Sequence, residues 1–209
     1  MKTKAYIFDF DGTLTTKDTL LEFIKYGRGR LALLWGLLLY APLLVLMKLR
    51  LYPNGKAKQK VFAHFFKGMC VDDFDTLCQR FADDNRARLL RPKGEETVKQ
   101  ALESGAMVMV VSASIVDWVK PFFSHYKVST APSTAHGICI LGTQLETYNG
   151  HLTGRFSTPN CYGREKVRRI EEVLQKPRTD YEILAFGDSR GDKEMLSFAD
   201  KGYYQPFRH

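Results

Sequence analysis

The chain has 209 residues, of which 44% are hydrophobic and 26% charged, a composition that is typical of a folded globular protein and excludes a low-complexity chain. This length allows one domain of ordinary size, or one core with a smaller insert. The formal net charge of +8 at pH 7 favours an anionic partner, such as a phosphorylated metabolite, an anionic membrane surface or nucleic acid.

Apolar, β-rich runs alternate with amphipathic segments along most of the chain. The pattern predicts strands over 4–9, 106–112 and 181–186, and helices over 93–104, 114–123 and 163–174. Asn149-Gly150 predicts a tight hairpin turn within 143–156. Because buried strands that alternate with helices favour a parallel sheet, we expect an α/β fold in which a doubly wound parallel sheet has helices on both faces.

The stretch from 16 to 91 does not follow this alternation. It is long, its pattern indicates helices, and it lies between the first strand and the rest of the sheet. We therefore expect an inserted helical cap over 16–91 and a core made of 1–15 and 92–209. The stretch holds 14 lysines and arginines against 7 aspartates and glutamates, and no acidic residue occurs between Glu22 and Asp72. Most of the excess positive charge therefore lies in the cap.

Polar side chains stand at the ends of the three predicted strands, and a predicted helix adds a lysine. The set is Asp9, Asp11, Ser112, Lys166, Asp188 and Asp192. Ligands of open parallel sheets bind at the carboxyl ends of the strands, so we expect these side chains to converge on one crevice. Taken singly, each residue has a simpler interpretation: Asp-Gly is common in turns, and a lone helical lysine is usually solvated. The complete set favours a site.

A cation and a phosphoryl group suit this site. Clustered carboxylates would hold protons unless a cation joined them, and hard oxygen ligands with room for water and phosphate suit Mg²⁺. A metal-held Asp9 is a competent nucleophile toward phosphorus, and Asp11 can protonate the leaving oxygen and later accept a proton from water. Phosphoryl oxygens would meet donors from the side chains of Ser112 and Lys166 and from the backbone N–H groups of Phe10 and Ala113.

These residues also carry a family resemblance. DFDGT at 9–13, a strand ending in Ser112, Lys166 on a helix and GDSRGD at 187–192 together resemble the four motifs of the haloacid dehalogenase (HAD) superfamily. The large insert after the first motif resembles subfamily IB, which includes phosphoserine phosphatase. The resemblance implies a Rossmann-like core with a helical cap, and the aspartate at the second acidic position is typical of the phosphatases.

The resemblance also implies roles for individual residues. Asp9 would be the nucleophile and Asp11 the general acid and base. Mg²⁺ would be held by Asp9, the Asp11 carbonyl and Asp188. Asp192 would support the metal's water shell or the lysine, and Ser112 and Lys166 would bind phosphate.

Residues 31–47, LALLWGLLLYAPLLVLM, form a stretch of 17 uncharged positions inside the predicted cap. As a helix it would be ~25 Å long, slightly short of the ~30 Å hydrocarbon core of a bilayer, and Pro42 would kink it. Three interpretations are open: a pair of buried cap helices broken near Pro42, an interfacial element that contacts an anionic membrane through 25–60, and a spanning helix. Such a cap also resembles that of phosphatidylglycerophosphatase-type members of the subfamily.

Asp18 lies where phosphoserine phosphatases carry a glutamate that meets the substrate amine. Two interpretations are open: a substrate contact, and an N-cap of a helix over 19–26. The shorter side chain and the basic cap argue against phosphoserine and favour a substrate with more than one negative charge.

We therefore predict a Mg²⁺-dependent phosphomonoester hydrolase that acts through an aspartyl-phosphate, with a lipid phosphate such as phosphatidylglycerophosphate as its substrate. The alternatives are a phosphatase of a small soluble metabolite such as phosphoserine, phosphoryl transfer to an acceptor other than water, and a non-catalytic basic lipid-binding module. No nucleic-acid partner is expected. The four cysteines show no C-x-x-C spacing, which favours reduced thiols, so we expect a cytoplasmic location with or without membrane association.

Overall fold

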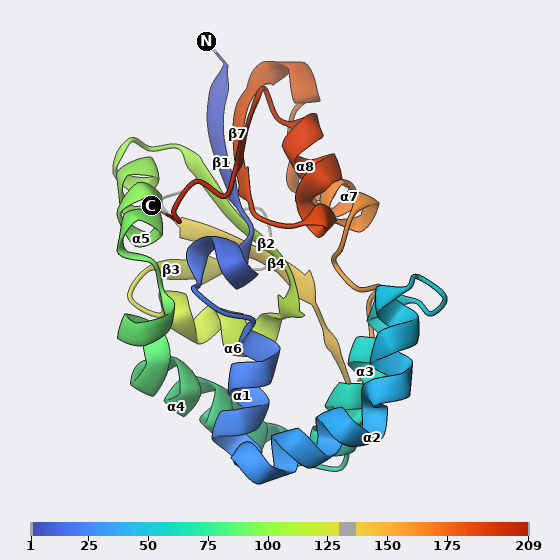
Figure 1. Ribbon diagram of the computed structural model, residues 1–209. Coiled ribbons are helices and arrows are strands. Elements are labelled where there is room, and N and C mark those ends of the chain that lie inside the picture. Colours follow the sequence, from blue (N-terminus) through green and yellow to red (C-terminus); the bar gives the residue numbers. More distant parts are fainter. Residues whose placement is uncertain (1, 130–136, 209) are drawn as a thin grey trace.

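The computed structural model describes residues 2–129 and 137–208, and a six-stranded parallel sheet lies at its centre (Figure 1). Residues 1, 130–136 and 209 of the predicted core lie outside the described residues. The strand order is β3-β4-β2-β1-β7-β8. The strands are Thr3–Phe8 (β1), Met107–Ile115 (β2), Lys127–Ser129 (β3), Gly137–Thr143 (β4), Tyr181–Gly187 (β7) and Lys201–Tyr204 (β8).

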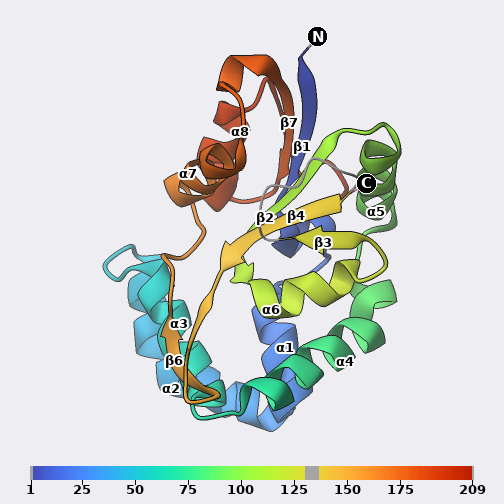
Figure 2. The same cartoon turned by 180° about the vertical axis from the view of Figure 1, so that it is seen from behind.

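Helices cover both faces of this sheet, because consecutive side chains of a strand point to opposite sides. On one face, Ala5 and Ile7 of β1 share a core with α7 (Arg164–Val173) and α8 (Lys193–Phe198). On the other face, Phe8 shares a core with the helices α5 and α6, which span Pro92–Glu103 and Val116–Val119. Figures 1 and 2 show α7 and α8 on one side of the sheet and α5 on the other. The predicted doubly wound α/β fold is confirmed.

Four helices connect β1 to α5, in the region expected to form the cap. They are Thr19–Arg28 (α1), Arg30–Lys48 (α2), Asn54–Phe66 (α3) and Val71–Leu89 (α4). They lie beyond the carboxyl ends of the strands and share a core of aromatic rings that includes Phe23, Phe62 and Phe81 (Figure 1). The division of the chain into core and cap stays a prediction.

The predicted hairpin turn is confirmed. Strands β5 (Leu145–Tyr148) and β6 (His151–Phe156) pair antiparallel, and the two residues between them, Asn149 and Gly150, have φ values of 46° and 73°. Positive φ at both positions suits the right-handed twist of a two-residue hairpin. The hairpin packs against α3 instead of joining the six-stranded sheet.

The structure of α2 contradicts one of the three interpretations of residues 31–47. The segment is one continuous helix that contains Pro42, and only 6% of its apolar 18-residue stretch is buried. The interpretation as a pair of buried cap helices is therefore wrong. Within residues 2–129 and 137–208, α2 is the one helix that is long and apolar enough to cross a membrane, by length and composition alone.

Candidate active site

Asp9 directly follows β1 at the carboxyl edge of the sheet, and it is buried. Its backbone N–H donates to the carbonyl of Phe186 in β7, at 2.8 Å. One carboxylate oxygen accepts a hydrogen bond from Lys166 Nζ at 2.6 Å, and the other accepts one from Thr13 Oγ1 at 3.1 Å. Contacts from β7, α7 and the turn after β1 therefore hold this carboxylate in one orientation.

Lys166 lies on the buried face of α7 and contacts β2 and the segments that follow β1 and β7. Its ammonium group donates to Asp9 Oδ1 at 2.6 Å, to Asp192 Oδ1 at 2.6 Å and to the Val111 carbonyl at 2.8 Å. Burial alone would lower the pKa of Lys166, but the two carboxylates raise this pKa above its ordinary value. The lysine is therefore a permanently charged, fully paired cation inside the protein.

The two carboxylates that share Lys166 have pKa values shifted in opposite directions. Burial raises the pKa of Asp9 to about 7, against the effect of Lys166, and the charges of Asp192 and Asp11 add to the rise. Burial also acts on Asp192, but Lys166 and Ser189 hold the pKa of Asp192 below its ordinary value. Asp9 is therefore the carboxylate whose ionised form gains most from a cation beside it.

The residues present fit a magnesium site. Asp9, Asp188 and Asp192 each offer a carboxylate oxygen, and these oxygens lie within 4.8 Å of one another. Asp192 is the most heavily hydrogen-bonded of the three: its Oδ1 accepts from Lys166, and its Oδ2 accepts from the backbone N–H groups of Asp188 at 3.1 Å and Ser189 at 2.9 Å and from Ser189 Oγ at 2.8 Å. Asp9 and Asp188 have fewer donors and are therefore the better ligands, and Asp192 suits the supporting position implied by the family resemblance.

The turn after β1 has to approach the Asp188 loop closely. Gly12 in this turn has a φ of +81°, and a Cβ at this position would collide with the Asp188 carboxylate. A left-handed backbone without a side chain is what glycine supplies. The glycine of the DFDGT motif is therefore required for the first and last motifs to meet.

Asp11 is held by hydroxyl groups from two elements. Its Oδ1 accepts from the backbone N–H of Thr19 at 2.8 Å and from Thr19 Oγ1 at 2.5 Å. Its Oδ2 accepts from Ser114 Oγ at 2.5 Å and from Ser112 Oγ at 3.4 Å. Ser114 was not predicted, although its spacing of two from Ser112 in a strand places both on one side. Neither the sequence pattern nor a motif identified Thr19.

The other predicted phosphate-binding residues are Ser112, Phe10 and Ala113. Of these, Ala113 lines the same cavity as Asp9 and Lys166. Ser112 is buried, and its Oγ accepts a hydrogen bond from the backbone N–H of Ser114 at 3.0 Å. The side chain of Phe10 belongs to the core. The phosphate-binding roles of Ser112, Phe10 and Ala113 stay predictions.

The residues after β8 also reach the site, which the sequence did not indicate. Arg208 donates a hydrogen bond to the Asp188 carboxylate, and Gln205 Nε2 donates to the Asp188 carbonyl at 3.4 Å. Burial raises the pKa of Asp188 and Asp192 adds to the rise, whereas Arg208 opposes it. No pattern in the sequence links this tail to Asp188.

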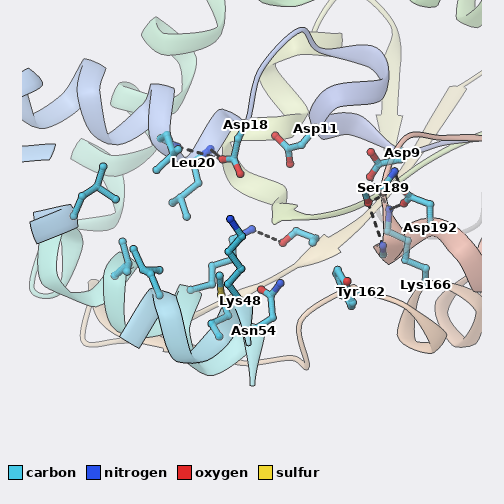
Figure 3. A pocket seen from close by; sticks show the side chains of 18 residues that line it. Asp9, Asp11, Asp18, Leu20, Lys48, Asn54, Tyr162, Lys166, Ser189 and Asp192 are labelled. Atoms are coloured by element: carbon cyan, nitrogen blue, oxygen red, sulfur yellow. Dashed lines mark hydrogen bonds and ion pairs between the residues drawn. The ribbon is translucent and has the colours of Figure 1, made fainter. Parts of the chain in front are cut away.

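A cavity of ≈ 630 Å³ opens beside the buried carboxylates (Figure 3). Figure 3 shows Asp9, Lys166 and Asp192 gathered at one end of it, with Asp18 and Lys48 toward the other end. The apolar side chains that line the cavity come from α1, α2 and α3 and are Leu20, Leu21, Leu37, Leu44, Met47 and Val61. The cavity is therefore polar at the carboxylates and apolar along the helices.

Asp18 caps α1, as one of the two interpretations expected, and it also lines the cavity. Its Oδ1 accepts from the backbone N–H groups of Leu20 at 2.9 Å and Leu21 at 3.3 Å. Lys58 of α3, which no motif identified, lines the same cavity and donates to the Ala113 carbonyl at 2.8 Å. Burial lowers the pKa of Lys58, although Asp11 and Asp18 oppose this shift.

Comparison with known proteins places the chain in a family. The sequence profile of the haloacid dehalogenase-like hydrolases matches residues 6–197. Protein CicA of Caulobacter vibrioides is 32% identical over 206 residues, covering 96% of this chain and 85% of CicA. A phosphoserine phosphatase of Archaeoglobus fulgidus is 28% identical over 137 residues, which are 65% of this chain and 35% of that protein.

A solved structure shares the fold. It is described as a phospho-aspartyl intermediate analogue of phosphoserine phosphatase, and it superposes with a TM-score of 0.57 at 19% identity, covering 98% of this chain and 86% of that chain. A parallel sheet with an acidic crevice at its carboxyl edge, together with the profile match, defines the class: the chain belongs to the haloacid dehalogenase-like hydrolase family. The predicted class of enzyme, a HAD-type hydrolase, is confirmed by the family, and a phosphatase is among the similar proteins.

Proposed function

We propose that the protein is a Mg²⁺-dependent phosphomonoester hydrolase that forms an aspartyl-phosphate at Asp9. One observation carries this proposal: Lys166 bridges Asp9 and Asp192 at 2.6 Å each, and Asp9 and Asp11 line the same cavity. A buried carboxylate oriented by a buried lysine is costly to maintain, and such sites are typical of catalysis.

The chain's own residues support each step. A carboxylate oxygen of Asp9 attacks phosphorus, the bond from phosphorus to the leaving oxygen breaks, and Asp11 gives that oxygen a proton. Water that loses a proton to Asp11 then attacks the phosphorus of the aspartyl-phosphate, which releases phosphate and restores Asp9. Lys166 keeps the attacking carboxylate in position. Mg²⁺, held by Asp9, Asp188 and the Asp11 carbonyl, would neutralise the phosphoryl oxygens.

The proposed substrate is a lipid phosphate such as phosphatidylglycerophosphate. The apolar side chains that α2 contributes suit the acyl chain of such a substrate, and the ammonium groups of Lys48 and Lys58 suit additional negative charge. A small soluble substrate such as phosphoserine is the second candidate, because Asp18 lines the cavity and one relative is a phosphoserine phosphatase.

A phosphatase assay on matched substrates tests this choice. We expect kcat/KM for a micellar lipid phosphate to exceed that for phosphoserine by about tenfold or more, because the apolar wall contributes binding only for the lipid. The measurement is the release of free phosphate. Faster hydrolysis of phosphoserine would contradict the lipid substrate. A phosphorylated acceptor without free phosphate would indicate transfer, and no turnover on any phosphomonoester would indicate a non-catalytic module.

Removal of divalent metal is expected to abolish hydrolysis. Without Mg²⁺, burial holds the pKa of Asp9 at about 7, so that at neutral pH this carboxyl group is in part protonated and cannot attack. The phosphoryl oxygens also lose the counter-charge of the metal. The measurement is the rate in excess EDTA, followed by addition of Mg²⁺ beyond the chelator, which should restore it. A rate that chelation leaves unchanged would exclude the metal role.

A further inference from the structure

The outer face of α2 is a row of exposed apolar side chains. The exposed fractions are 74% for Leu31, 61% for Leu34, 70% for Trp35, 65% for Leu38 and 56% for Val45. Their spacings of three, four and seven residues place them on one side of the helix. Soluble surfaces rarely carry so many contiguous apolar side chains, and such patches usually contact a protein or a membrane.

The inner face of the same helix is already occupied. A Cβ at Gly36 would collide with the ring of Phe65, so α2 lies directly against α3. The ring of Tyr40 lies 5.5 Å from that of His64, also in α3, and Leu44 lines the cavity of the site. Because the inner face is fixed in this way, rotation of α2 cannot bury the outer row. Figures 1 and 2 show α2 at the edge of the helical region.

Cations border the outer row at both of its ends, and no acidic residue lies in the same part of the chain. The exposed cations are Arg28 and Arg30 before the row along the chain, and Lys48, Arg50, Lys56 and Lys60 after it. No aspartate or glutamate occurs between Glu22 and Asp72. An apolar row with a basic border is the pattern of a helix that lies in the interface of an anionic bilayer.

We propose that the outer face of α2 docks this protein onto an anionic lipid bilayer, with the helix lying along the surface. A second copy of the chain is the poorer occupant, because pairing these faces would bring two basic borders together. A spanning orientation would require α2 to leave α3 and the cavity. Since α2 also supplies one wall of the cavity, docking brings the cavity next to the membrane.

Vesicle binding tests this docking without any reference to catalysis. The protein is expected to sediment with vesicles of mixed phosphatidylglycerol and phosphatidylcholine. Vesicles of phosphatidylcholine alone, or added salt, should reduce the sedimented fraction several-fold. Trp35 gives a direct readout, because the only other tryptophan, Trp118, is buried. Its emission should shift to the blue on vesicles, and the shift should be absent in Trp35→Phe while sedimentation persists.

A pair of matched variants locates the contact. Leu34→Gln with Leu38→Gln should reduce vesicle partitioning about tenfold or more, because two exposed side chains lose their transfer to the interface. Tyr148→Gln with Tyr204→Gln, whose exposed fractions of 71% and 63% are similar, should not change it. Circular dichroism checks that both variants are folded.

Four outcomes would overturn the proposal. The first is the absence of sedimentation at low salt, and the second is equal binding to neutral and anionic vesicles. The third is a dimer in analytical ultracentrifugation that the α2 variant dissociates, which would assign the face to a second copy. The fourth is protein that only detergent removes from vesicles, which would indicate a spanning helix. A catalytically inactive Asp9→Asn protein should still bind vesicles, so failure of the phosphatase assay leaves this test intact.

Discussion

An Asp9→Asn variant is expected to lose phosphatase activity by about four orders of magnitude and to remain folded. The neutral amide of asparagine is a poor nucleophile and forms no acyl phosphate, so the aspartyl-phosphate path is closed. The fold should survive because asparagine is neutral and needs no buried charge. Burial of that charge is unfavourable in Asp9, whose pKa it raises to about 7. The measurement is kcat for the preferred phosphomonoester, together with the thermal unfolding temperature.

The matched control is Asp180→Asn, at an exposed aspartate in the turn before β7. It should keep full activity. A variant at Asp9 that still turns over the substrate at more than about a hundredth of the original rate would rule out the covalent route. A denaturant-stable but inactive Asp9→Asn protein would support it.

A Lys166→Met variant is expected to lose both activity and about 3–5 kcal/mol of the free energy of unfolding at neutral pH. Methionine fills the same space but leaves Asp9 and Asp192 buried without their shared cation. The pKa values of both carboxylates should then rise. An acid whose pKa is raised in the folded state destabilises the fold above its unfolded pKa, so the loss should shrink toward acidic pH, at about pH 4.

Denaturant unfolding at neutral and acidic pH measures this effect, with Lys99→Met as the control at an exposed lysine of α5. The control should change stability by less than about 0.5 kcal/mol. A loss of stability, relative to the original protein, that is the same at both pH values would show that the lysine does not stabilise the buried carboxylates.

Much of the fold followed from local pattern. The strands β1, β2 and β7 and the helices α5 and α7 were predicted because long apolar runs and amphipathic periods are strong local signals. The strands β3, β4 and β8 were missed. The strand β3 has only three residues, β4 is an apolar run whose hairpin-like continuation at Thr143 concealed its end, and β8, Lys201–Tyr204, is exposed along its whole length. Such edge and short strands depend on their neighbours rather than on their own residues.

The candidate site divides in the same way. Asp9, Asp11, Asp188 and Asp192 were predicted, because carboxylates at strand ends contradict the usual apolar pattern and so are visible in the sequence. Lys166 was predicted only because it completes the set with these carboxylates. Ser114, Lys58 and Arg208 were not, because each is an ordinary residue type whose importance comes only from the atom that it meets.

The amino-acid sequence by itself determined the class of fold, the acidic residues and the lysine of the crevice, and the apolar character of 31–47. Only the tertiary structure decided which face of α2 is covered, which oxygens of the aspartates already have partners, and that the last residues of the chain reach Asp188. The physical reason is that burial and hydrogen bonding are properties of pairs of segments. A periodic pattern reports that a helix has an apolar side, but the partner that covers this side is set by packing across distant parts of the chain.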